Sequence, residues 1–188
     1  MKTFDLGLLA TVIVASSAFA GEEVVSKDYK EPAPPTTCFK DQELQLDFFG
    51  SFMNQPYGHF DYRDGGGGGV GVNYFFIRYV GVGQDIDVDA NRDGVSNYTG
   101  KVIFRLPIEA GGVCIAPYFF GGGGVESFFG DRYEHFHSQS NGALMAGGGL
   151  EWRITPRFGI FAEGRYTWTV PRTVEDNDRV RLGLRVAF

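Results

Sequence analysis

The last ten residues of the chain, 179–188, alternate between apolar side chains and polar or small ones at every position. Successive side chains of a β-strand point to opposite faces, so one face of this strand is apolar and the other carries Arg179, Arg181 and Arg185. Three arginines facing a dry protein core would be costly, because buried charge is expensive unless it is neutralised. A β-barrel in a bilayer avoids this conflict, since its apolar face contacts acyl chains and its polar face lines the lumen.

The first twenty residues have the pattern of a cleaved secretory signal peptide. They have a short basic start that contains Lys2, continue with a mostly apolar run over residues 6–14, and end in the small-residue sequence Ala18-Phe19-Ala20. That run is too short to span a bilayer, and no later segment holds the roughly 18 apolar residues that a membrane helix needs. We therefore expect residues 1–20 to be a signal peptide, and a membrane-spanning exported chain to cross with β-strands.

Composition is typical of a small barrel and argues against some partners. The chain has 28 glycines, 18 phenylalanines and 9 tyrosines among its 188 residues, whereas glycine is usually about 7% of a sequence. The net charge of −6 argues against nucleic acid as a partner. Residues 21–42 are first charged and then proline-rich, so we expect a periplasmic lead-in that builds no core of its own.

From residue 43 onward the chain divides into alternating segments separated by turn signals. This pattern predicts an all-β fold, an eight-stranded antiparallel up-and-down transmembrane β-barrel over residues 43–188. We place its strands at residues 43–53, 67–76, 79–89, 97–107, 112–124, 141–154, 158–169 and 178–188. The connections after the second, fourth and sixth strands are short, as at residues 108–111, and the others are longer. Short turns in the periplasm and long loops outside are typical of outer-membrane barrels, and pairing of the last strand with the first would close the sheet.

If the apolar positions face lipid, the polar positions of the same strands face the lumen. Eight strands leave an interior just wide enough for side chains to fill it. The inward acids and bases are nearly balanced, so we expect them to pair with one another and to leave no open pore. The predicted lumen charge network consists of Asp47, Asp85, Asp87, Lys101, Arg105, Glu151, Arg153, Glu163, Arg165, Arg181 and Arg185.

A family resemblance rests on these features and on two segments, Leu182-Gly-Leu-Arg-Val-Ala-Phe188 and Gly69-Val-Gly-Val-Asn-Tyr-Phe-Phe76. Residues 43–188 resemble the small outer-membrane barrels of the OmpA transmembrane-domain and OmpX type. The resemblance implies a place in the outer membrane of a Gram-negative cell, in contact with outer-membrane lipid. In that family the assembly machinery recognises the terminal aromatic strand, a role that falls here to Phe188, Val186, Leu184 and Leu182. We expect a monomer without a cofactor, and a possible extracellular ligand bound through the loops.

Two cysteines, Cys38 and Cys114, remain in the exported chain. The periplasm is oxidising, so an even cysteine count there favours a disulfide. Cys38 precedes the first predicted strand and Cys114 follows the periplasmic turn into the fifth, which puts both at the same rim of the barrel. We hypothesise that the lead-in folds under the barrel and is pinned across its mouth by a Cys38–Cys114 bond; two free thiols are the alternative.

The longest predicted loop offers the one hint of catalysis. It gathers His135, His137, Ser138 and Ser140, residue types that form nucleophile and base pairs. A lipid A-modifying outer-membrane enzyme, either an acyl hydrolase or an acyltransferase, is therefore the rival function. Known deacylases of this kind carry a His-x-Ser sequence on a lipid-facing strand, which this loop does not supply, so we favour a structural or surface-interaction role. A soluble lipocalin-like barrel is a third possibility and predicts an apolar interior.

Overall fold

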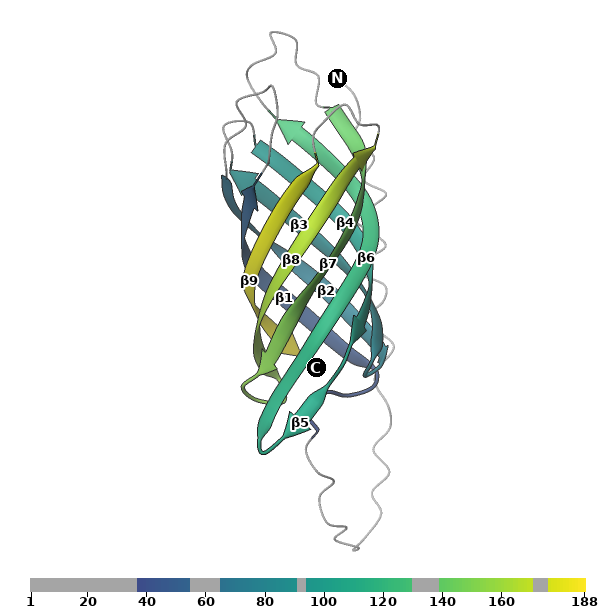
Figure 1. Ribbon diagram of the computed structural model, residues 1–188, viewed down its shortest axis with the longest axis vertical. Coiled ribbons are helices and arrows are strands. Elements are labelled where there is room, and N and C mark those ends of the chain that lie inside the picture. Colours follow the sequence, from purple (N-terminus) through teal and green to yellow (C-terminus); the bar gives the residue numbers. More distant parts are fainter. Residues whose placement is uncertain (1–36, 55–64, 91–93, 130–138, 171–175) are drawn as a thin grey trace, which may run out of the picture. The chain divides into compact units, whose positions relative to one another are not determined.

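The computed structural model describes residues 37–54, 65–90, 94–129, 139–170 and 176–188. In these residues the chain forms one antiparallel sheet, whose long strands wind around a common axis (Figure 1). The strands are β1 (Glu43–Asn54), β2 (Gly65–Ile77), β3 (Val80–Ala90), β4 (Gly94–Arg105), β5 (Ile108–Ala110), β6 (Val113–Phe129), β7 (Gln139–Arg153), β8 (Phe158–Val170) and β9 (Asn177–Ala187).

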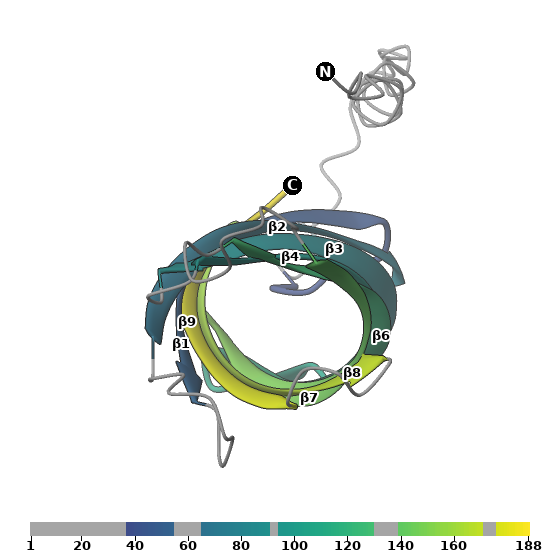
Figure 2. The same ribbon diagram turned by 90° about the horizontal axis from the view of Figure 1, so that it is seen from above.

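Eight long strands close the sheet into a ring, which Figure 2 shows from one end. Each long strand pairs with its neighbour in the sequence, except that β6 follows β4 across the short β5. The last strand, β9, pairs with β1 over ten residue pairs from Gln45↔Ala187 to Asn54↔Asp178. The predicted eight-stranded antiparallel barrel and its closure by the first and last strands are confirmed.

The two faces of the sheet have opposite chemistry. On β9, Val180 and Leu182 are 61% and 67% exposed on the outside, whereas Arg179 and Arg181 are 1% exposed on the inside. The same alternation of exposed apolar and buried polar side chains runs along the other long strands. An apolar outside around a charged inside is the arrangement of a barrel in lipid, and the soluble lipocalin-like alternative is wrong.

The strands are long enough to cross a bilayer. The long ones run from 11 residues in β3 to 17 in β6, and a tilted membrane strand needs about 9–11. Trp152 and Trp168 are exposed near opposite ends of the barrel, where aromatic side chains meet the lipid headgroups. No helix in the described part of the chain is both long and apolar enough to span a membrane.

One connection differs from the sequence prediction. Residues 108–111 were expected to form a short turn, but Ile108–Ala110 form strand β5, which pairs with the start of β6. The chain reverses instead at Gly111 and Gly112, whose φ angles are +59° and +80°. Two successive positive φ values are what a two-residue hairpin turn with the twist of its strands requires, and glycine supplies them at low cost.

Close contact between strands explains part of the glycine content. A Cβ atom on Gly122 would lie 2.0 Å from the backbone oxygen of Gly100, and one on Gly124 would lie 2.0 Å from that of Tyr98. Any other residue at these inward positions would push the neighbouring backbone away. The glycine run at residues 121–124 therefore permits tight coiling of β6 against β4.

Candidate functional site

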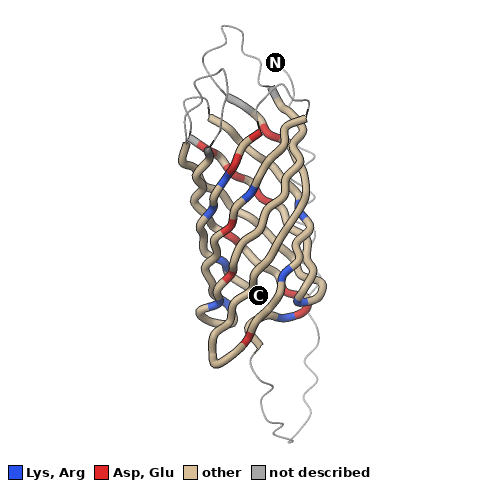
Figure 3. Tube along the Cα trace, viewed as in Figure 1, with Lys and Arg blue, Asp and Glu red and all other residues tan. Residues whose placement is uncertain are grey.

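Buried charged side chains line the lumen. Figure 3 shows by colour that charged residues are spread along the length of the strands. They include every member of the charge network predicted from the sequence. In the described residues the buried carboxylates number eight and the buried cations seven: Glu43, Asp47, Asp85, Asp87, Asp89, Glu126, Glu151 and Glu163, with Lys101, Arg105, Arg153, Arg165, Arg179, Arg181 and Arg185.

At the end with the short turns, one carboxylate binds two arginines. Glu43 begins β1, while Arg105 and Arg153 end β4 and β7, so the three side chains meet at the same rim. Oε1 of Glu43 accepts hydrogen bonds from Arg105 Nη1 at 2.8 Å and from Arg153 Nη2 at 2.7 Å. The Arg105 guanidinium also stacks on the ring of Phe75, at 3.7 Å from its centre. This first group of ion pairs spans three strands that are distant in the sequence.

The segment before β1 covers this group. The Phe39 side chain is 1% exposed, and the guanidinium groups of Arg105 and Arg153 lie 4.8 Å and 4.9 Å from its ring centre. Arg153 Nη1 donates to the Cys38 carbonyl at 3.1 Å, and the Phe39 amide donates to Glu109 Oε1 at 3.3 Å. We call residues 37–40 the rim plug, because they pack onto the lumen at its short-turn end.

A disulfide joins the rim plug to the barrel. Cys38 is bonded to Cys114 on β6, with a Cα–Cα distance of 6.1 Å, which is usual for such a bond. Both residues are buried with Phe39 and Ala116 in one apolar cluster. The bond therefore holds Phe39 against the arginines below it.

Removal of this disulfide should release the rim plug without opening the barrel. In a Cys38→Ser, Cys114→Ser variant we expect hydrogen exchange at the amide of Phe39 to become about tenfold faster or more, because β1 begins only at Glu43 and the plug loses its covalent anchor. Peptides from β8 serve as the internal control and should keep their protection. Equal protection of Phe39 in the oxidised protein and in the variant would contradict this role for the bond.

The middle of the lumen is organised around two arginines of β9. Arg185 binds Asp47 through Nε and Nη2, both at 2.7 Å, and Glu151 through Nη1, also at 2.7 Å. Asp47 is held from its other side by Asn73 Nδ2 at 2.8 Å. Such two-pronged contacts between guanidinium and carboxylate are among the strongest that side chains form.

Arg181 binds three carboxylates on two other strands. Its Nη1 donates to Asp85 Oδ2 at 2.9 Å and to Glu163 Oε1 at 3.2 Å, and its Nη2 donates to Asp87. Lys101 shares Asp85, with Nζ at 2.8 Å from Oδ2. Because Asp85 and Asp87 lie on β3 and Glu163 on β8, this side chain connects opposite walls of the barrel.

At the end with the long connections, Arg179 continues the series. Its Nη1 donates to Asp87 Oδ2 at 2.9 Å, and its Nη2 lies 2.6 Å from Asp89 Oδ2. Asp89 also accepts a hydrogen bond from Ser51 Oγ at 2.7 Å. Arg165 completes this group with Nη2 at 3.5 Å from Asp87 Oδ1.

These contacts pair the charges that are buried in the lumen. Each of the buried cations lies within 4.0 Å of a carboxylate oxygen. Several of the pairs connect strands that are not neighbours in the sheet, as Arg105 of β4 does with Glu43 of β1. Buried charges of this kind are tolerated only when they are paired and hydrogen-bonded. Among the described residues, no group of three or more His, Cys, Asp or Glu is arranged to hold a metal ion.

Sequence reasoning missed three residues of the site. Glu126 was assigned to a loop, yet it lies on β6 with Oε1 at 3.3 Å from Asn177 Nδ2. The inward side chains of β6, such as Cys114 and Tyr118, have even residue numbers, and so does Glu126. Continuing the alternation past the glycine run would therefore have placed Glu126 in the lumen. Glu43 has the parity of Asp47 and could have been found in the same way. Phe39 has no such signal, because it lies outside any strand.

The candidate catalytic residues and the signal peptide lie outside the described residues. This holds for His135, His137 and Ser138, and for residues 1–20. Ser140 is described at the start of β7, where it is exposed and its Oγ lies 2.9 Å from Ser127 Oγ.

Comparison with known proteins finds no family model and no curated protein that matches the sequence. Solved structures do match. The N-terminal β-barrel domain of OprF from Pseudomonas aeruginosa has a TM-score of 0.62 at 17% identity, over 79% of this chain and 99% of that domain. Neisserial surface protein A has a TM-score of 0.61 at 16% identity, over 78% of this chain and 96% of that one. The outer membrane protein OprG from Pseudomonas aeruginosa has a TM-score of 0.51 at 11% identity, over 81% and 98%. The described chain therefore has the fold of a small outer-membrane barrel.

Proposed function

We propose that this chain, which shares the fold of small outer-membrane barrels, is an outer-membrane protein with a structural or surface-interaction role and without an open pore. The observation that carries the proposal is the ion pairing in the lumen, in two networks that together extend from Glu43 at one end to Arg179 near the other. Opening a path for ions would leave several buried charges without partners, which is costly. The rim plug at the short-turn end supports the same conclusion.

Electrical recording tests the absence of a pore. We expect the protein, reconstituted in a planar bilayer, to give no stepwise current in salt solution, because ion pairs occupy the lumen. A porin inserted in the same way is the positive control, and heat-dependent mobility on a denaturing gel verifies that the barrel is folded. Repeated current steps of one size would contradict the proposal.

We also propose that β9 carries the signal for assembly into the membrane. Leu182, Leu184 and Val186 form its outer row, and Phe188 follows the strand with its side chain 65% exposed. The Phe188 amide donates to the Leu44 carbonyl at 2.9 Å, which fixes the aromatic residue at the seam between β1 and β9. We expect an assembly factor to bind the edges of β1 and β9 before these two strands pair.

The proposal also concerns the oligomeric state in which the chain folds and the partners that it binds. One chain supplies all the strands of the ring, which supports folding and insertion as a monomer. Binding of an extracellular ligand is assigned to the connections at the end opposite the short turns. Those connections, at residues 55–64, 91–93, 130–138 and 171–175, lie outside the described part of the chain.

A further inference from the structure

Among the described residues, the apolar outside of the barrel contains one amide side chain far from the strand ends. Gln84 is the fifth of eleven residues in β3, and it points outward between Val82 and Ile86. Other outward polar residues, such as Ser96, Ser127 and Asp178, lie within three residues of a strand end. Within the described part of the chain the Gln84 amide makes no hydrogen bond.

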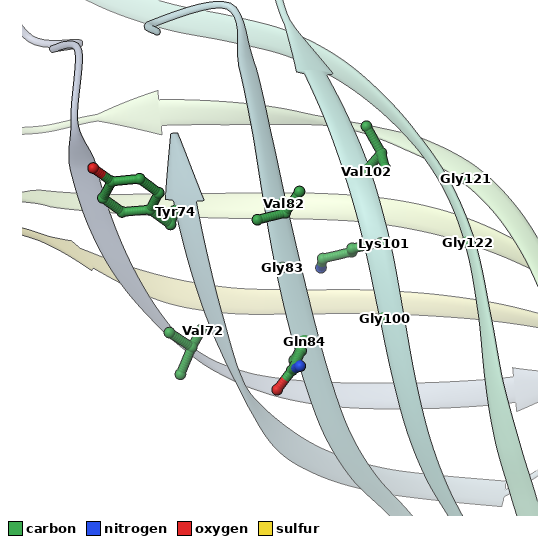
Figure 4. A pocket seen from close by; sticks show the side chains of 10 residues that line it. All are labelled: Val72, Tyr74, Val82, Gly83, Gln84, Gly100, Lys101, Val102, Gly121 and Gly122. Carbon is green, nitrogen blue, oxygen red and sulfur yellow. The ribbon is translucent and has the colours of Figure 1, made fainter. Parts of the chain in front are cut away.

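A hollow in the outer surface adjoins Gln84. It has a volume of about 450 Å³, and its floor is formed by glycines that include Gly100 and Gly121. Figure 4 shows Val72 and Tyr74 on one side of it and Val102 on the other. The pairing of the strands places Gln84 directly between Val72 of β2 and Gly100 of β4.

A bare amide in hydrocarbon is unfavourable, because acyl chains offer neither a hydrogen-bond donor nor an acceptor. Its partner must therefore present both groups at the depth of Gln84 in the membrane. Lipid ester groups lie at the interface and not at the middle of a membrane-spanning strand. A second copy of this chain meets the requirement, because the same residue lies at the same depth in every inserted copy.

We infer that two folded barrels pair in the membrane through this surface, with the two Gln84 amides exchanging reciprocal hydrogen bonds. A twofold axis along the membrane normal and close to Gln84 brings β2 of one copy against β4 and β6 of the other. The side chains of Val72 and Tyr74 then project toward the hollow over Gly100 and Gly121 of the partner. Small residues that admit a neighbour, together with a polar side chain that bonds across the contact, are typical of interfaces within membranes.

The experiment measures association of the intact barrel in lipid. Protein carrying Arg157→Cys in an exposed turn is labelled with donor or acceptor dye, and energy transfer is recorded in vesicles of phosphatidylethanolamine and phosphatidylglycerol over a range of protein-to-lipid ratios. We expect transfer that rises with protein density and gives a dimer. Gln84→Leu should weaken dimerisation about tenfold, because two interchain hydrogen bonds are lost.

Two glycine variants provide a matched pair. A Cβ on Gly100 meets only the Gly123 backbone oxygen at 3.9 Å, and one on Gly164, outward on β8, meets nothing within 4 Å. Gly100→Leu should therefore fold, fill the hollow and abolish dimerisation, whereas Gly164→Leu should dimerise like the parent. Monomers at every ratio, or dimers unaffected by Gln84→Leu, would overturn the inference. Monomers that retain lipid, and lose it in Gly100→Leu, would overturn it too, because the hollow would then be a lipid site. Heat-dependent mobility identifies any variant that has not folded.

Discussion

Replacement of Arg181 by methionine is expected to lower the free energy of unfolding by about 3–5 kcal/mol, the cost of breaking a buried ion pair from one side. Arg181 binds Asp85, Asp87 and Glu163, and all four side chains are at most 3% exposed. Methionine keeps much of the volume but removes the one charge among the described residues that contacts all three carboxylates. Denaturant unfolding of the reconstituted barrel, followed by tryptophan fluorescence, gives the free energy.

Two further variants separate this effect from a general loss of positive charge. Arg157→Met removes an exposed arginine of the turn between β7 and β8, and should change stability by less than about 0.5 kcal/mol. Addition of Glu163→Gln to Arg181→Met should recover about 1–2 kcal/mol, because one of the orphaned carboxylates becomes neutral. If the double variant is no more stable than Arg181→Met alone, the ion pair between positions 181 and 163 contributes nothing.

Leu182→Arg places a charge on the other face of the same strand and is expected to destabilise the inserted barrel by about 2–4 kcal/mol. Leu182 is the sixth of eleven residues in β9 and is 67% exposed, so its side chain lies near the middle of the apolar belt. On a protein surrounded by water, a substitution at such an exposed position would have little effect. Unfolding measured in lipid vesicles checks the expected value.

An arginine placed near the end of β9, and not at its middle, is the control for the Leu182→Arg experiment. Asp178 is the second residue of β9, exposed, and close to the end with the long connections. Asp178→Arg should cost at most about 1 kcal/mol, because arginine near the interface reaches the headgroups. Equal stability of Leu182→Arg and the parent protein would mean that water, and not hydrocarbon, contacts the outer face.

The strands that alternate charge with apolar residues could be predicted to within three residues at each end. For β9 the prediction was residues 178–188, and the strand is Asn177–Ala187. The alternation predicted these strands because their two faces contact media of opposite polarity. The side chains of each face match the polarity of the medium that they contact. In β6 the glycine run hides the period, so the predicted end at residue 124 fell five residues short of Phe129.

The alternation along each strand assigned side chains to the lumen, but it could not predict which cation binds which carboxylate. Arg185 binds Glu151, which is 34 residues away, and Asp47, which is 138 residues away. These partners depend on the stagger of the strands around the ring, a property of the closed sheet that no single strand encodes. The burial of Phe39 depends on the same closure, because the arginines that it covers come from β4 and β7.

The distribution of cations among the strands has a consequence for the order of barrel formation. Strands β1 to β8 contribute all eight lumenal carboxylates but only four of the cations: Lys101, Arg105, Arg153 and Arg165. A sheet that lacks β9 would therefore have an excess of negative charge on its inward face. The three arginines of β9 neutralise that charge when the strand pairs with β1 and β8. Electrostatic attraction between β9 and the rest of the sheet therefore favours the closed barrel, in addition to the hydrogen bonds along the seam.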